Sequence, residues 1–160
     1  MELTLPPALQ PLAALLERAV AERDEATARL YLLLESGRRL QSQQQQLHAY
    51  RNEYQARWSG QFRQSASMQV VHSYQAFVTR LDHALQQLQM QMDDANTQAE
   101  SARELLLQCE MRVAAVRKLL ERRLSDHGRG VQLREQKQTD EFASATLWRG
   151  GALLAAPMNS

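Results

Sequence analysis

The sequence is poor in cysteine, proline, glycine and aromatic residues, and each shortage excludes a class of protein. Among 160 residues there are six glycines, four prolines, one cysteine and 6% aromatic residues. The single cysteine, Cys109, excludes an intramolecular disulfide. The glycines are scattered and form no phosphate-binding loop. The net charge of +1 gives no global field that would favour nucleic acid or a membrane surface.

Long hydrophobic runs are also missing. No run approaches the ~20 apolar residues of a membrane span, and the N-terminus has no basic stretch before an apolar one. We therefore expect neither a membrane-spanning helix nor a signal peptide, and a cytoplasmic protein is the simplest expectation.

Residues that carry enzyme or metal chemistry do not form a pattern. The four histidines share no metal-ligand spacing with each other or with the cysteine; they are His48, His72, His83 and His127. We expect no metal, no cofactor and no catalytic residue, and the sequence does not predict an enzyme.

What the sequence does contain is one long apolar stripe between residues 71 and 120. Apolar residues recur there at alternating steps of three and four, without proline or glycine. The positions are Val71, Tyr74, Val78, Leu81, Leu85, Leu88, Met92, Ala95, Ala99, Ala102, Leu106, Cys109, Val113, Val116 and Leu120. This spacing is typical of a coiled-coil seam on a helix about 75 Å long, which needs a partner stripe of similar length.

The first third of the chain supplies that partner stripe. Its better half recurs every seven residues, at Leu12, Ala19, Ala26, Leu33, Leu40, Leu47 and Tyr54. The interleaved half is poorer, and consists of Leu16, Arg23, Leu30, Gly37, Gln44, Arg51 and Trp58. We predict an all-α fold: a long antiparallel two-helix coiled-coil hairpin in which the numbers of paired residues add to about 130. In this register small residues oppose large ones, as close packing requires.

Proline, glycine and serine mark the predicted boundaries. The expected segments are an extended lead-in at 1–10, helix 1 at 11–57, a connector at 58–67, helix 2 at 68–147 and a flexible tail at 148–160. Gly60 and three serines indicate the connector, and Ser67 is a candidate N-cap for helix 2. Trp58 and Phe62 either cap the end of the hairpin or stand exposed at its tip as a contact site.

Helix 2 is predicted to overhang helix 1. The seam ends at Leu120, yet the sequence stays helical in pattern, with eight Lys/Arg against five Asp/Glu from Arg117 to Arg149. Gly128 and Gly130 weaken this overhang and could bend or interrupt it.

Phe77 lies beside the seam rather than on it. A large apolar side chain beside a complete seam indicates a docking site. In that case Phe77 would contribute little to folding. The alternative is that Phe77 packs over helix 1 near Tyr50 or Tyr54. The residues alone leave both interpretations open.

Four stretches in order resemble the flagellar export protein FliJ family across about residues 12 to 145. They are AERDEATARL at 21–30, YRNEY at 50–54, SYQAFV at 73–78 followed by Leu81 and Ala84, and REQK at 134–137 followed by DEF at 140–142. The resemblance implies a non-enzymatic component of the flagellar type III export apparatus, shaped like the central stalk of rotary ATP synthase. It places the chain in flagellum biogenesis, and so in chemotaxis, at the inner face of the cell membrane.

The resemblance also implies partners and contact residues. The terminal ends would enter the hexameric export ATPase FliI, and we carry ATPase contact to Arg134, Glu135, Gln136, Lys137, Asp140 and Glu141. The cytoplasmic domain of the export gate protein FlhA would bind Phe77, Leu81, Ala84 and Leu88. Export chaperones are further partners, and nucleic acid is not one. The isolated chain is expected to be a monomer.

Three other interpretations remain on the sequence alone. A virulence type III secretion stalk shares the architecture but usually lacks the Tyr-Gln-x-Phe run. A coiled-coil dimerisation or scaffold protein would instead form its seam between two chains. A nucleic-acid binder is a third interpretation, but the basic overhang lacks the interleaved aromatic residues that single-strand binding needs.

Overall fold

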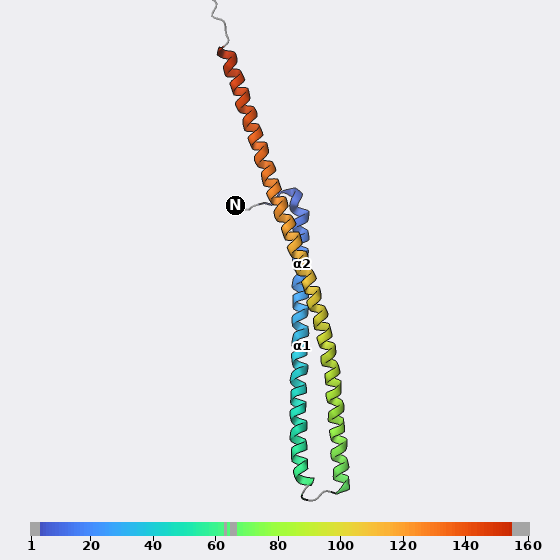
Figure 1. The fold of residues 1–160 in the computed structure, drawn as a ribbon. Coiled ribbons are helices and arrows are strands. Elements are labelled where there is room, and N and C mark those ends of the chain that lie inside the picture. The colour runs from blue at the N-terminus through green and yellow to red at the C-terminus, as the bar shows by residue number, and fades with distance from the viewer. Residues whose placement is uncertain (1–3, 63, 65–66, 155–160) are drawn as a thin grey trace, which may run out of the picture. The chain divides into compact units, whose positions relative to one another are not determined.

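The computed structural model describes residues 4–62, 64 and 67–154, and in these residues the fold is all-α. A short 3-10 helix η1 (Pro7–Leu9) precedes two long helices, α1 (Gln10–Phe62) and α2 (Met68–Leu154) (Figure 1). The chain divides into two units. Unit 1 comprises Met1–Arg18 and Val113–Ser160, and unit 2 comprises Ala19–Arg112.

Unit 2 is an antiparallel helical hairpin. Within it, α1 and α2 run side by side in opposite directions from the connector (Figure 1). Gln44 Nε2 donates a hydrogen bond to Gln89 Oε1 over 2.8 Å, and Arg112 Nη1 lies 2.8 Å from Glu22 Oε2. In both pairs the residue numbers add to about 130, so the predicted register is confirmed.

The predicted seam is the buried stripe of both helices. Every seam position predicted on α1 and α2 is buried or half-buried. The fully buried ones are mostly small: Ala19, Ala26, Leu81, Leu85, Ala99, Ala102, Cys109 and Val113. Two helices cover a side chain from only one direction, so a small residue can be enclosed while a large one keeps part of its surface in water.

Small residues do not oppose large ones everywhere in unit 2, and the seam around Gly37 is an example. Leu33 and Leu34 lie with Ala95 and Ala99 around a partly open groove of about 320 Å³. Gly37 also lines this groove, and no described atom beyond its local helix backbone lies within 4 Å of a Cβ built on it. A small residue therefore meets small residues here, and the seam is locally underfilled.

Unit 1 joins the start of the chain to the second half of α2. Leu9 is buried, and Leu12, Leu15, Leu119 and Arg123 line a shallow groove of about 330 Å³ beside it. Beyond residue 130, every described side chain up to residue 152 is exposed. This exposed stretch, 131–152, covers most of the overhang predicted after Leu120 and the start of the predicted tail, and it is called the arm below.

The predicted extended lead-in at 1–10 is wrong for residues 7–10, which are helical. Pro7 begins η1, in which the Leu9 N–H donates to the Pro6 carbonyl oxygen over 2.9 Å, and α1 already begins at Gln10. Proline lacks an N–H that a first turn leaves unpaired in any case, so it fits there. Residues 1–3 of the predicted lead-in lie outside the described part of the chain.

The connector is shorter than predicted, because α1 continues from Trp58 to Phe62. The Trp58 and Phe62 rings both pack on Tyr74 of α2, at centroid distances of 6.1 and 5.2 Å. This packing holds the last turn of α1 helical despite Gly60. Of the connector, residues 63, 65 and 66 lie outside the described chain.

The N-cap prediction for α2 is confirmed. The Val70 N–H lies 3.4 Å from Ser67 Oγ, and the Ser67 carbonyl oxygen accepts from the N–H groups of Val70 and Val71. Two N–H groups in the first turn of α2 therefore have their acceptors on one serine.

The predicted end of helix 2 at residue 147 is also wrong. The helix passes Gly128, Gly130 and the pair Gly150–Gly151 without a break and ends at Leu154. No described glycine has the positive φ of a helix-terminating cap, so each one weakens the helix without ending it. Residues 155–160 of the predicted tail lie outside the described chain.

Candidate functional site

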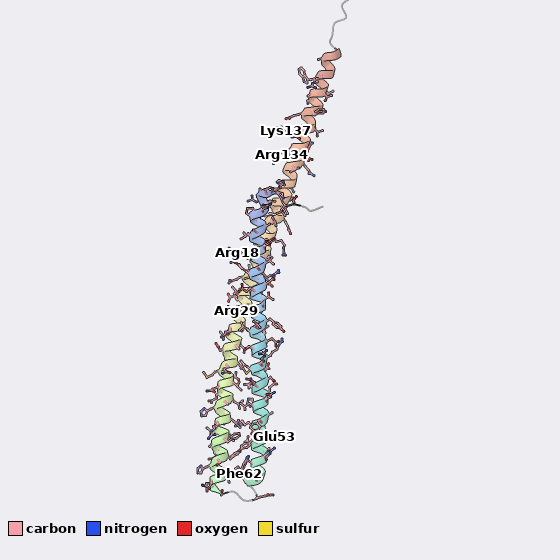
Figure 2. The ribbon with its side chains drawn as sticks, turned by 180° about the vertical axis from the view of Figure 1, so that it is seen from behind. Arg18, Arg29, Glu53, Phe62, Arg134 and Lys137 are labelled. Atoms are coloured by element: carbon pink, nitrogen blue, oxygen red, sulfur yellow. The ribbon has the colours of Figure 1, made fainter. Side chains whose placement is uncertain are left out.

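Six aromatic rings gather at the connector end of unit 2. They are Tyr50, Tyr54, Trp58 and Phe62 of α1 with Tyr74 and Phe77 of α2, and they are called the aromatic cluster below. Figure 2 shows Phe62 at the connector end of α1. Tyr54 stacks on Tyr74 with centroids 5.6 Å apart, so the cluster ties the two helices together. Trp58 and Phe62 are half-buried within it, which favours capping of the hairpin over exposure at its tip.

Phe77 packs over α1, as one of the two interpretations of the sequence requires. Its ring centroid lies 4.5 Å from that of Tyr54 and 6.2 Å from that of Tyr50, the latter edge-on. Phe77 is half-buried, whereas Tyr50 is 49% exposed. One side of the Phe77 ring therefore stabilises the hairpin while part of its surface stays accessible, and the expectation that it adds little to folding must be revised.

The other residues carried from the resemblance differ in accessibility. Leu81 is buried at 8% exposure, while Ala84 and Leu88 are half-buried. Leu81 can therefore act on a partner mainly by holding its neighbours in place. The Ala84 side chain is small, so it leaves the neighbouring Phe77 ring uncovered on that side. The four residues lie along one side of α2, and their role in gate binding stays a prediction.

An ion pair beside the aromatic cluster was not predicted. Arg51 Nε lies 2.7 Å from Asp82 Oδ1, across the two helices, with 30% and 47% of the side chains exposed. In the sequence, Arg51 falls in the poorer half of the first stripe. The signal was available: an arginine on a seam needs an acidic partner, and the predicted register puts Asp82 close to it.

The six residues proposed for ATPase contact all lie on the arm and all are exposed. Figure 2 shows Arg134 and Lys137 on this stretch of α2. Successive helical residues are about 100° apart, so the four residues 134–137 point in all directions around the helix axis. They cannot all meet one flat surface. An enclosing partner could contact all of them.

Large apolar side chains accompany these charges on the arm. Leu133, Phe142, Leu147 and Trp148 are 66%, 77%, 76% and 83% exposed. Exposed apolar side chains of this size, within one helix, mark a segment suited to contact with another protein.

Neither a metal site nor a membrane span occurs in the described chain. Residues 4–62, 64 and 67–154 contain no group of three or more His, Cys, Asp or Glu side chains arranged to hold a metal ion. In the same residues, no helix has the length and apolar character needed to cross a membrane.

The fold and these surfaces define a helical hairpin protein with charged and large apolar side chains exposed along its second helix. A family model described as "Flagellar FliJ protein" matches residues 9–152, which include nearly all of α1 and α2. The chain belongs to the FliJ family and is thus a component related to flagellar protein export. Searches of curated proteins and of solved structures returned no match.

Proposed function

We propose that this protein is a non-enzymatic stalk of the flagellar type III export apparatus. In this role it links the export ATPase FliI to the export gate protein FlhA and handles export chaperones. It would act in the cytoplasm, at the inner face of the cell membrane, and would be a monomer when isolated. The observation that carries the proposal is a helical hairpin whose second helix continues as a fully exposed arm.

The arm supports the contact with the ATPase. Its side chains are exposed on all sides, and they include both charged and large apolar residues. A single helix of this kind buries its surface only inside a partner that surrounds it. A hexameric ATPase with a central opening is a partner of that geometry.

The aromatic cluster supports the contact with the gate. Phe77 is an aromatic anchor held in place by Tyr50 and Tyr54, so little conformational freedom is lost when a partner binds. Anchors of this type carry most of the energy of protein interfaces.

Truncation tests the ATPase contact. A chain ending at Leu124 lacks the arm but keeps the buried seam, so its helicity per residue should stay nearly unchanged while stimulation of FliI ATPase activity is lost. Normal stimulation by the truncated chain would refute the contact. Co-purification with FliI measures the binding directly.

A finer variant separates the proposed contact from general charge effects. Arg134→Ala with Lys137→Ala removes two cations from the arm. Arg39→Ala with Arg103→Ala removes two exposed cations from unit 2 and serves as the matched control. Only the first pair should weaken stimulation. Equal loss with both pairs would show a non-specific effect of net charge.

A further inference from the structure

Two glycines on α2 have no packing reason to be glycine. Neither Gly128 nor Gly130 has a positive φ, and no described atom outside the local helix backbone lies within 4 Å of a Cβ built on either one. Alanine would therefore fit both positions without strain. What the glycines change is the stability of the helix itself.

The glycines lie in a weak segment between two strong ones. Residues 125–131 have the sequence SDHGRGV. Six of these seven are poor helix formers, and Arg129 is the exception. The preceding RKLLERRL at 117–124 and the following QLREQKQ at 132–138 consist entirely of good ones. Helix propensity thus falls sharply over seven residues and then recovers.

Tertiary packing does not compensate for this weakness. From residue 121 to residue 152 every described residue except Gly130 is exposed. Helices in proteins derive most of their stability from packing of a buried face, which this stretch lacks. Its order depends on its own hydrogen bonds and propensities, so it should open first where propensity is lowest.

We propose that residues 125–131 form a hinge in α2, at which the helix opens locally and allows the arm to change direction. Water can satisfy the backbone groups released by opening, because the segment is exposed all round. The arm beyond the hinge remains helical, since residues 132–138 are good helix formers. This inference concerns the free chain and does not depend on any partner.

The hinge has a consequence that rests on the proposed function. If the arm contacts the ATPase, a hinge at its base lets the arm adjust to the partner without disturbing the seam of unit 1. The two can fail separately. A chain that binds the ATPase but has no hinge contradicts only the hinge, and a chain that has the hinge but does not bind contradicts only the proposed function.

Millisecond hydrogen exchange of the full-length chain tests the hinge. In the wild type, the amides of residues 128–134 should exchange faster than those of 116–122. The variant Gly128→Ala/Gly130→Ala should slow exchange in 128–134 about thirtyfold, since each exposed helical glycine raises the opening constant about fivefold relative to alanine. Exchange at 116–122 should not change.

The pair Gly150→Ala/Gly151→Ala is the matched control. These glycines are also in α2, also exposed, and also without a described neighbour within 4 Å of an added Cβ. The control should leave exchange in 128–134 unchanged. Equal rates in 116–122 and 128–134 of the wild type, or no slowing in the first variant, would overturn the hinge.

Spin labels measure the bending directly. With the native cysteine replaced by alanine, labels at Glu121→Cys and Gln138→Cys flank the hinge, about 26 Å apart along a straight helix. The wild-type glycines should give a broad distance distribution, and the Gly128→Ala/Gly130→Ala background a narrow one. A distribution that is narrow in both would exclude a hinge.

Discussion

Replacing Phe77 with alanine measures how far its ring serves folding and how far it serves docking. A fully buried Phe→Ala substitution costs ~3–5 kcal/mol, so we expect about half of this, roughly 2 kcal/mol, for a half-buried ring. The contacts with Tyr54 at 4.5 Å and Tyr50 at 6.2 Å account for part of that loss, at ~0.5–1.5 kcal/mol per aromatic pair. A chain of this length should then melt about 4–8 °C lower.

The docking role predicts a separate change, in binding. Loss of an anchor at an interface costs about 2 kcal/mol or more, so binding to the cytoplasmic domain of FlhA should weaken at least about thirtyfold. Binding is measured by calorimetry well below the melting temperature, where the variant is folded by circular dichroism. Binding to the ATPase should stay unchanged.

Val78→Ala is the control for Phe77→Ala. Val78 is the next residue, a half-buried seam position, and its truncation should lower the melting temperature by a few degrees while leaving the Phe77 surface intact. If both variants bind the gate equally well, Phe77 only packs the hairpin and the docking role must be withdrawn. If Phe77→Ala melts like the wild type, the contacts of Phe77 with Tyr50 and Tyr54 do not stabilise the hairpin.

Three further predictions concern the hairpin itself. Gly37→Ala should stabilise the protein by about 1 kcal/mol in urea unfolding, because the added methyl meets no described neighbour and alanine favours the helix; a destabilised variant would contradict this. Asp82→Arg should destabilise by ~1 kcal/mol, and the swap with Arg51→Asp should recover most of it; no recovery would show that the pair does not interact. Leu12→Cys with Leu120→Cys, with the native cysteine replaced by alanine, should crosslink within one chain through a short bifunctional reagent. Crosslinks only between chains would instead indicate an intermolecular seam.

The seam could be predicted because it depends on geometry alone. An alternating three-four spacing puts one stripe on one side of a helix, and two stripes of similar length in one chain can satisfy each other. Burial at every predicted position follows from that. The register also follows, since Trp58 and Val71 flank a connector too short to allow a large offset.

The ends of the helices were harder to predict, because local propensity competes with packing. Gly60 and its neighbouring serines favour a turn, but the Trp58 and Phe62 rings reach Tyr74 only if the helix continues to Phe62. The turn residues are visible in the sequence, whereas the ring contacts depend on how the two helices pack. The predicted end at 147 fails for another reason: Gly150 and Gly151 do not end the helix, because neither has the positive φ of a helix-terminating cap.

At the candidate gate site, too, some features follow from helical periodicity and others depend on how the helices pack. The position of Phe77 beside the seam follows from helical periodicity, but its partners depend on the register of α1. That register brings Tyr50 and Tyr54 to the ring, and it makes Leu81 a buried residue rather than an accessible one. The sequence alone therefore predicts the side of α2 on which these residues lie. Only the structure shows which of them are accessible.

The polar residues that interrupt the first stripe explain why one register is chosen. A seam that repeats every seven residues buries nearly as much apolar surface after a slip of one heptad. Such a slip would separate Gln44 from Gln89 and place Arg51 near Gln75 or Gln89 instead of Asp82. A polar residue at a seam position can specify register at some cost in stability, and Gln44 and Arg51 each pair with a polar residue beside the seam of α2. The residues that weaken the stripe in the sequence are thus the ones that discriminate between registers, and through the register they set Phe77 over Tyr50 and Tyr54.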